Sequence, residues 1–355
     1  MAGRSFVFVR QKLKGEKKMK KKLTALLLSA AMAFSLAACG STQTATSAAP
    51  SASAAASGAA EGKTYTVGIC QLVQHVALDA ATKGFKQALT DKLGDKVKFD
   101  EQNASNDTAT CATICNQFVS SKVDLIMANA TPALQAAQTA TSTIPVLGTS
   151  VTDYGTALGI SDWSGKSGTN VSGTSDLAPL DKQADIIKEL FPDAKKVGIL
   201  YCSAEPNSAY QSKVITGYLK KLGYTCKDYT FSDSNDLQSV VTTCANDSDV
   251  IYVPTDNTVA SNAAIIKNVC LPLKKPVVAG EEGICSGCGV ATLSISYYDL
   301  GYETGEMAYY ILVNGKKPGE MEVQFAPKFT KEYNAEICKE LGITPPSDYQ
   351  AIAAK

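Results

Sequence analysis

Polar residues suited to holding a small ligand follow a short apolar run in the segment DVIYVPTDNTVASN (249–262). Thr255, Asp256 and Asn257 stand where this run ends and a helix is expected to begin. A carboxylate at the end of a buried strand is costly unless a partner stabilises its charge. Asp256 is therefore expected either to cap the following helix or to contact a positively charged ligand group, and we favour the ligand.

Residue patterns that support catalysis are missing from this sequence. No G-x-S-x-G or G-x-G-x-x-G segment follows a strand pattern. The near match GISDWSGKS (159–167) spaces its glycines one residue too far apart for a phosphate loop. The single histidine, His75, excludes a multi-histidine metal site, and its place at a helix start favours ligand contact or capping over catalysis. We expect neither an enzyme nor a metal or cofactor site.

Cysteines are numerous for an exported chain, with 11 in all. Cys111 and Cys115 share the apolar face of one predicted helix, which indicates core packing rather than metal binding. Cys285 and Cys288 form a C-x-x-C segment between strand patterns. Redox or zinc chemistry stays open there, but we favour a pair of loop thiols that can close as a disulfide.

The N-terminal region predicts export. The stretch KKMKKKLTALLLSAAMAFSLAACG is basic, then apolar, and ends in Leu-Ala-Ala-Cys, which resembles a bacterial lipobox with Cys39 as the acylated residue. An uncleaved transmembrane helix is disfavoured, because the apolar run of about 16 residues is short for a span. We predict a signal peptide over 1–39, with Met19 as the true start, and a flexible Ser/Thr/Ala linker over 40–63.

Charge is distributed unevenly along the chain. The net charge is zero, but the first 39 residues contain nine Lys and Arg and one acidic residue. The remainder has 25 basic and 33 acidic residues, a net charge of −8. This balance, without a basic stripe, argues against a nucleic-acid partner.

Short β-rich runs alternate with helical patterns from Tyr65 onward, which predicts an α/β protein with parallel sheets. The order of runs then recurs: YTVGIC resembles KKVGILYC, VDLIMANAT resembles SDVIYVPT, and IPVLG resembles KPVVAG. Any doubly wound protein repeats its strands, but the nearly constant offset between these matches favours two similar doubly wound lobes.

Ligands of open α/β sheets bind beyond the carboxyl ends of the strands. Two facing lobes would therefore line a cleft with the residues at those ends. They are uncharged hydrogen-bonding residues or acids, as suits a small polar ligand with a positive charge: Gln71, Thr131, Ser150, Asn207, Ser208, Thr255, Asp256, Asn257 and Glu281.

Several segments carry a resemblance to a known family. GICQLVQHVALDAATKGFKQAL, DLIMANATPALQAA, GTSDLAPLDKQ, VGILYCSAEPNS, IYVPTDNTVAS and ISYYDLGYETGEMA resemble the ABC-transporter substrate-binding lipoproteins of the tryptophan/tyrosine-type group. The resemblance runs from about 65 to 345 and implies a type I periplasmic-binding-protein fold with a three-segment hinge. It implies crossings near 175, 293–297 and 322–325, with lobe one at 64–175 plus 296–322 and lobe two at 176–295 plus 323–350. Permease and ATPase subunits are the implied partners.

We expect an α-amino acid as ligand, with an aromatic one favoured by the resemblance. Its ammonium would pair with Asp256, aided by Glu281 or a tyrosine. Its carboxylate would meet donors at helix starts and strand ends, and further residues would bracket the side chain. The donors expected for the carboxylate are Thr131-Pro132, Ser150 and Asn207-Ser208, and the bracketing residues are Gln71 and Tyr298, with His75 as a further contact.

Two other functions remain open at the level of sequence. A sugar- or nucleoside-binding protein would use the same fold, although such sites favour stacked aromatic residues, and the only tryptophan, Trp163, lies in a predicted loop. A ligand sensor that feeds a receptor is the second. In every case we expect an exported monomer, lipid-anchored to the outer face of the bacterial cytoplasmic membrane.

Overall fold

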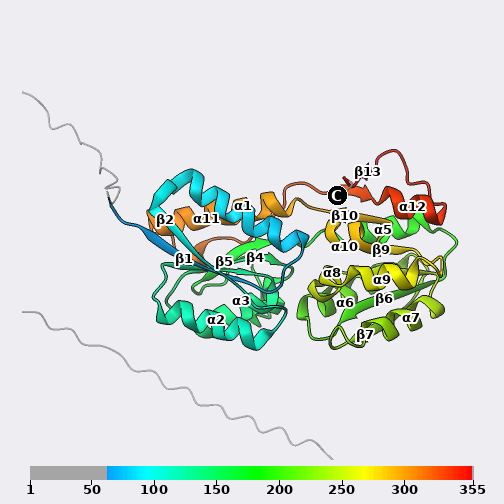
Figure 1. Cartoon of the computed structure of the whole chain (residues 1–355), viewed down its shortest axis with the longest axis horizontal. Coiled ribbons are helices and arrows are strands. Elements are labelled where there is room, and N and C mark those ends of the chain that lie inside the picture. The colour runs from blue at the N-terminus through cyan, green and yellow to red at the C-terminus, as the bar shows by residue number, and fades with distance from the viewer. Residues whose placement is uncertain (1–61, 354–355) are drawn as a thin grey trace, which may run out of the picture. The chain divides into compact units, whose positions relative to one another are not determined.

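The computed structural model describes residues 62–353 (Figure 1). The predicted signal peptide, Cys39 and all but the last two residues of the predicted linker lie outside this range. Among the described residues, none of the helices has the length and apolar character needed to cross a membrane.

The first sheet has six strands in the order β11-β5-β4-β3-β1-β2, and every neighbouring pair is parallel. Its central strands are buried on both faces, as their continuous Val, Ile, Leu and Ala content dictates. The strands are β1 (Tyr65–Gln71), β2 (Val97–Asn103), β3 (Leu125–Asn129), β4 (Val146–Val151), β5 (Val171–Ser175) and β11 (Gln324–Phe325).

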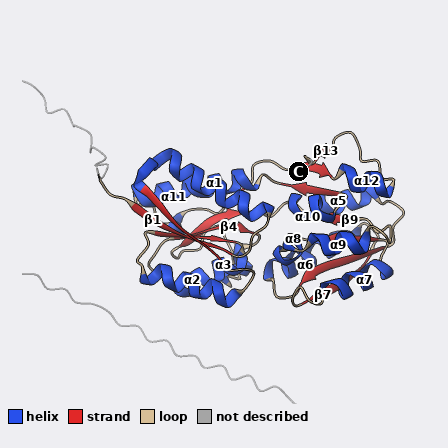
Figure 2. Cartoon of the chain, viewed as in Figure 1, coloured by secondary structure: helices blue, strands red, loops and turns tan. Residues whose placement is uncertain are grey.

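Helices cover both faces of this sheet (Figure 2). On one face α1 (Val76–Leu93) and α11 (Tyr297–Asn314) pack together, and on the other lie α2 (Thr108–Ser120) and α3 (Thr131–Ala140). The two helices of the first pair approach so closely that a Cβ at Gly301 would overlap the Ala81 carbonyl oxygen. Shorter elements complete this lobe: η1 (Gly94–Lys96), α4 (Tyr154–Leu158) and η2 (Pro318–Glu320).

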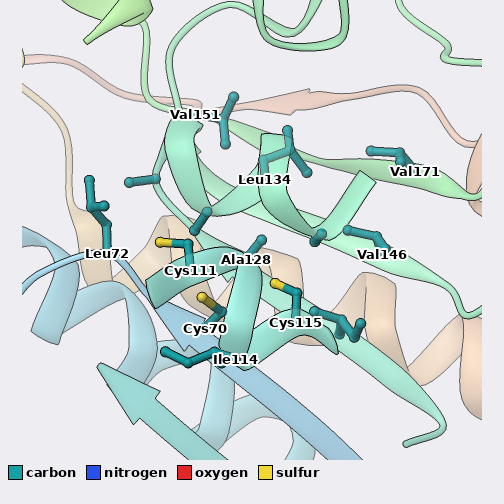
Figure 3. Close-up of a cluster of buried hydrophobic side chains, with 14 of the residues drawn as sticks. Cys70, Leu72, Cys111, Ile114, Cys115, Ala128, Leu134, Val146, Val151 and Val171 are labelled. Carbon is teal, nitrogen blue, oxygen red and sulfur yellow. The ribbon is translucent and has the colours of Figure 1, made fainter. Parts of the chain in front are cut away.

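Thiols form part of the core beneath α2. Cys70 of β1 lies beside Cys111 and Cys115 of α2, and all three are fully buried among aliphatic side chains (Figure 3). This confirms the prediction that the two helical cysteines pack in the core. All ten cysteines of the described residues are free, and burial raises the pKa of most of them, which favours inert thiols.

The second sheet has seven strands in the order β13-β12-β10-β9-β8-β6-β7. Its pairs are parallel except that β12 runs antiparallel to β10. The strands are β6 (Lys196–Cys202), β7 (Thr225–Phe231), β8 (Val250–Val253), β9 (Val277–Ala279), β10 (Ala291–Ser294), β12 (Thr330–Tyr333) and β13 (Gln350–Ala351).

The second sheet is also covered on both faces. One core cluster joins the sheet to α5 (Leu180–Leu190), α6 (Pro206–Lys221) and α12 (Ala335–Leu341). The other joins it to α7 (Leu237–Asp247), α8 (Asn257–Ser261), α9 (Ala263–Cys270) and α10 (Glu282–Cys288). The sheet orders and the coverage on both faces confirm the prediction of two doubly wound lobes.

Both lobes share the strand order second-first-third-fourth-fifth of doubly wound sheets, counted within each lobe. In such sheets the ligand site lies beyond the carboxyl ends of the strands, where the winding direction reverses. Here that point falls between β1 and β3 in one lobe and between β6 and β8 in the other. Three segments connect elements of the two lobes: 176–179, 295–296 and 326–329.

Two sequence predictions need correction. β11 pairs with β5 in the first sheet, although we assigned 323–325 to lobe two, because two exposed residues give no hydropathy signal for an edge strand. The C-x-x-C segment at Cys285 and Cys288 lies in α10 rather than in a loop, and both thiols are buried and free, without the disulfide that we considered. The helix forms despite two glycines because the Glu281 side chain caps it.

Candidate ligand-binding site

A small enclosed cavity lies between the two lobes, beyond the carboxyl ends of β1, β4, β5, β6, β8 and β9. Its volume of about 10 Å³ suits one water-sized group. The lining residues come from both lobes and from the connecting segment 176–179. They are His75, Leu78, Ser150, Thr152, Asp176, Asn207, Thr255, Asp256, Asn257, Ala260, Glu281 and Tyr297.

Four polar atoms of this lining have no hydrogen-bond partner in the structure: His75 Nδ1, Ser150 Oγ, Asp176 Oδ1 and Asn207 Oδ1. Buried polar atoms are nearly always paired, because leaving one unpaired costs about 1–3 kcal/mol. Four such atoms around one cavity therefore indicate a position where a small polar group, from a ligand or a water, completes their hydrogen bonding.

His75 precedes α1, and its ring is fixed in one tautomer by a contact across the lobes. Nε2 lies 3.2 Å from Asn257 Oδ1, and the amide nitrogen of Asn257 donates to Glu205 Oε2 at 2.7 Å. Since Asn257 Oδ1 is an acceptor, Nε2 is the donor, and Nδ1 of the neutral ring is a buried acceptor without a partner. Burial lowers the pKa of His75, which favours this neutral form.

Ser150 and Asn207 present one polar atom each from opposite lobes. Ser150 adopts the left-handed backbone conformation (φ 54°) at the end of β4, where the register with β5 shifts. This conformation is costly for serine, and such strain is characteristic of functional positions. Asn207 donates through Nδ2 to Glu205 Oε2 and to the Thr255 carbonyl oxygen, so its Oδ1 is the atom left for a ligand.

Asp176 is the carboxylate with a free oxygen. It follows β5 directly, and its Oδ2 accepts a hydrogen bond of 3.0 Å from the Tyr297 hydroxyl, whereas Oδ1 has no partner. Burial raises the pKa of Asp176 to about 6, against the opposing effect of the hydrogen bond from Tyr297. A cation beside Oδ1 would stabilise the ionised form.

Asp256 also lines the cavity, but both of its carboxylate oxygens accept hydrogen bonds from residues of its own lobe. Oδ1 accepts from the Val259 N–H at 2.8 Å and so caps α8, and Oδ2 accepts from the Cys202 N–H and the Ser208 hydroxyl at 2.7 Å each. Burial and the neighbouring Glu205 raise the pKa of Asp256. The geometry matches the capping alternative for Asp256.

Glu205 supports the same helix start. Its Oε1 accepts from the N–H and hydroxyl of Thr258, and its Oε2 accepts from Asn257 and Asn207. Glu281 plays the corresponding part at α10, where its oxygens accept from the N–H groups of Gly283 and Ile284. Burial raises the pKa of Glu281 to about 7.

The remaining predicted residues lie outside the small cavity. The Gln71 side chain makes its hydrogen bonds within its own lobe, to Asp79, Thr82 and the Val73 carbonyl oxygen. Thr131 has an unpartnered hydroxyl and is the first residue of α3. Elsewhere, Pro132 lines a surface depression, Ser208 binds Asp256, and Tyr298 lines a second, larger cavity.

Sequence reasoning missed Thr152, Asp176, Glu205 and Tyr297. The signal for Asp176 was present, because it stands at the carboxyl end of β5 in the segment NVSGTSD. Tyr297 lies in a segment that we expected to connect the lobes, and only the fold brings its hydroxyl to Asp176. Within residues 62–353, no group of three or more His, Cys, Asp or Glu side chains has a metal-binding arrangement.

Direct contacts across the cleft close the small cavity. Besides the His75–Asn257 contact, Asn106 Nδ2 donates to Thr258 Oγ1 at 3.0 Å, and the hydroxyls of Thr152 and Thr255 lie 3.4 Å apart. A whole amino acid does not fit a cavity of about 10 Å³, so entry of such a ligand requires the lobes to separate.

A family model described as ABC transporter substrate binding protein matches residues 66–355. A tyrosine-binding protein of Clostridioides difficile is 42% identical over 264 residues, which is 74% of this chain and 76% of that protein. Solved structures with the type I periplasmic-binding-protein fold match over most of the chain, which confirms the predicted fold class.

Two of these structures differ in state. The domain from Streptococcus pneumoniae in complex with L-Trp has a TM-score of 0.78 at 34% identity, covering 82% of this chain and 100% of its own. The ligand-free, open structure of a substrate binding protein with adhesive properties from Clostridium difficile has a TM-score of 0.64 at 39% identity, with the same coverage. The open structure thus has the lower TM-score although its sequence identity is higher.

Proposed function

Because this chain belongs to the family of ABC transporter substrate binding proteins, it is a solute-binding protein and not an enzyme, and we propose that its ligand is an aromatic L-amino acid held between the two lobes. A protein of this family captures a small molecule for an ABC permease. Relatives named for tyrosine or solved with L-Trp support the aromatic class.

The observation that carries the proposal is the set of unpaired acceptors. An ammonium group has three donors and no acceptor. His75 Nδ1, Asp176 Oδ1 and Asn207 Oδ1 are three acceptors without donors around a cavity that suits one such group. We assign the ligand's α-ammonium to this position, with Asp176 as its counter-ion in place of Asp256, whose oxygens are already occupied.

The α-carboxylate is assigned to neutral donors. The cavity lining contains no Lys or Arg, and Ser150 offers a hydroxyl hydrogen that nothing else accepts. Hydrogen bonds to charged groups are strong in a water-excluded site, so neutral donors suffice when the lobes close over the ligand.

Isothermal titration calorimetry of residues 62–353 with L-Tyr, L-Trp, L-Phe, glucose and adenosine tests this proposal. We expect binding of aromatic amino acids and none of the sugar or nucleoside. Asp176→Asn should weaken binding at least about 30-fold, because loss of one partner of a buried charge pair costs about 2–5 kcal/mol. Asp185→Asn, the same substitution on the exposed side of α5, is the matched control. Unchanged affinity in a folded Asp176→Asn protein would refute the ammonium assignment.

We also propose export and anchoring through Cys39, which lies outside the described residues. The motif before Cys39 supports acylation, and the linker 40–63 would then hold a monomeric binding domain at the outer face of the cytoplasmic membrane. Metabolic labelling with a palmitate analogue tests this: the full chain should incorporate label in the membrane fraction, and Cys39→Ser should lose it. Label that persists in the variant would exclude this site.

A further inference from the structure

Glu205 is a buried carboxylate on which five hydrogen-bond donors converge. It precedes α6 and is 3% exposed, yet its side chain does not cap that helix. Oε1 accepts from the N–H and the hydroxyl of Thr258 at 2.8 Å each. Oε2 accepts from the N–H of Asn257 at 3.0 Å, from its side-chain amide at 2.7 Å and from the side-chain amide of Asn207 at 3.1 Å. Within residues 62–353 Glu205 forms no salt bridge, so these neutral donors stabilise its charge.

Two of these donors belong to side chains that also contact the opposite lobe. The Thr258 hydroxyl has one hydrogen, which it donates to Glu205, so its oxygen is the acceptor for Asn106 Nδ2 at 3.0 Å. The side-chain amide nitrogen of Asn257 also donates to Glu205, which leaves Oδ1 as the atom 3.2 Å from His75 Nε2. Glu205 therefore determines which atom each residue presents to the other lobe.

The same carboxylate orients a residue of the candidate ligand site. Asn207 lines the small cavity, and its Nδ2 donates to Glu205 Oε2 and to the Thr255 carbonyl oxygen. Its Oδ1 is thereby left as the buried atom without a partner. If this amide turned over, it would offer a donor in place of the acceptor that an ammonium needs. Glu205 does not itself line the cavity, so it acts on a ligand only through Asn207.

The first lobe presents Asn106 from a fixed loop. Asn106 and the residue before it, Ser105, both adopt the left-handed backbone conformation, with φ of 64° and 53°. Asparagine is among the residues that tolerate this conformation. The Asn106 N–H donates to the Leu72 carbonyl oxygen at 2.8 Å, which ties the loop to the chain just beyond β1. The contact with Thr258 thus joins two atoms that are each held in place by their own lobe.

We propose that Glu205 is a positioning residue that couples closure of the lobes to capture of the ligand. One carboxylate orients Asn207 for the ligand and orients Asn257 and Thr258 for the opposite lobe. This inference rests on the proposed function and adds to it a residue that does not contact the ligand. A carboxylate is required, because an amide of the same size has one oxygen and would set its two hydrogens against the converging donors.

Calorimetry of the full chain with L-Tyr tests the coupling. Glu205→Gln should raise the Kd at least about tenfold, because buried donors lose their acceptor. Asn106→Gly tolerates the positive φ and removes only the side chain that contacts Thr258, so the Kd should rise about two- to tenfold. In the double variant the two effects should fall short of their product, because loss of Glu205 already releases Thr258. Glu340→Gln, exposed on α12, is the control, and thermal melts establish that each variant is folded.

A spectroscopic measurement separates positioning from a merely structural role. His75 is the only histidine of the chain, so NMR of protein labelled with ¹⁵N-histidine reports on its ring alone. With L-Tyr bound at neutral pH, the wild type should carry its ring hydrogen on Nε2 and none on Nδ1. Glu205→Gln allows the Asn257 amide to turn over and should give both tautomers. A structural role alone would lower the melting temperature without changing the tautomer.

The outcomes separate this inference from the proposed function. If the wild-type chain binds no aromatic amino acid, the proposed function fails, and the coupling to capture fails with it. If the wild type binds L-Tyr and a folded Glu205→Gln protein has the same affinity or the same single tautomer, or if the effects of Glu205→Gln and Asn106→Gly simply multiply, only the role of Glu205 is overturned. If Glu205→Gln does not fold, Thr258→Val replaces it. That variant removes the hydroxyl between Glu205 and Asn106 and should weaken binding as much as Asn106→Gly does, whereas wild-type affinity would overturn the inference.

Discussion

The affinity for an amino acid should fall as the pH falls through 6, and Asp176 should be the main cause. Asp176 lines the cavity, its Oδ1 has no partner, and burial raises the pKa of the carboxyl group to about 6. An ammonium binds the ionised carboxylate, so the ligand competes with a proton at this atom. The ligand's own ammonium stays charged throughout the range from pH 5 to pH 8.

The magnitude follows from the fraction of protein that is competent to bind. With a pKa of about 6, the ionised fraction of Asp176 is roughly 0.9 at pH 7 and roughly 0.1 at pH 5, so the apparent Kd rises about tenfold. Two other groups that line the cavity also weaken ligand binding as the pH falls. Protonation of His75 places a second cation near the ligand, and Glu281, with a pKa of about 7, becomes neutral as the pH falls.

The stability of the empty protein should respond with the opposite sign. The pKa of Asp176 in the folded chain exceeds its value of about 4 in the unfolded chain, so the folded state binds more protons between about pH 4 and pH 6. Its contribution to the free energy of unfolding therefore falls as pH rises through that window, by about 3 kcal/mol in total. Asp176→Asn should remove this contribution.

Calorimetric titrations at pH 5, 6, 7 and 8, paired with urea denaturation of the ligand-free protein, provide the assay. The wild-type Kd should rise toward low pH, and the Asp176→Asn protein should bind weakly with a flatter profile. An equally steep profile in the variant would assign the titration to another group. A wild-type affinity that is constant from pH 7 to pH 5 would refute the reasoning.

Three further predictions concern stability and thiols. Asp256→Asn should lower the free energy of unfolding in urea by about 1–3 kcal/mol, because an amide cannot accept all three hydrogen bonds. If this substitution weakened amino-acid binding more than Asp176→Asn does, the capping role would be contradicted. Gly301→Ala should destabilise the protein by about 1–3 kcal/mol, because the added Cβ overlaps α1. Gly217 is a helical glycine with open space around it, so Gly217→Ala should stabilise the protein by roughly 0.5–1 kcal/mol. Equal melting temperatures of the two variants would refute this packing. Both cysteines of α10 should be alkylated after unfolding without reductant, and a mass two hydrogens lighter would reveal a disulfide.

The fold was predictable because buried parallel strands and amphipathic helices leave periodic patterns in the sequence. β8 shows this, since VIYV is apolar throughout and is buried throughout. Elements without such a pattern were missed. β11 has two exposed residues and is defined by its pairing with β5, and α10 contains two glycines and depends on capping by Glu281.

The location of the site could be predicted from the sequence, but the role of each residue in it could not. Strand order locates the cleft, and seven of the predicted residues line the small cavity. The sequence does not say which of their oxygen atoms already accept hydrogen bonds within the protein. Asp256 and Asp176 both follow strands, and both are buried. They differ because Cys202, Ser208 and Val259 supply donors to the first, whereas Tyr297 supplies one donor to the second.

The unpaired atoms also bear on why the lobes close. Because the small cavity holds one water-sized group, a water leaves at least one of the three acceptors unpaired in the closed protein without ligand, at about 1–3 kcal/mol. Each 1.4 kcal/mol of such a differential changes a two-state equilibrium about tenfold. A single water in the cavity has two hydrogens and cannot satisfy three acceptors, whereas an ammonium has three. The same atoms that recognise the ligand thus penalise closure without it, so closure is coupled to capture by hydrogen bonds that an amino acid completes and water does not.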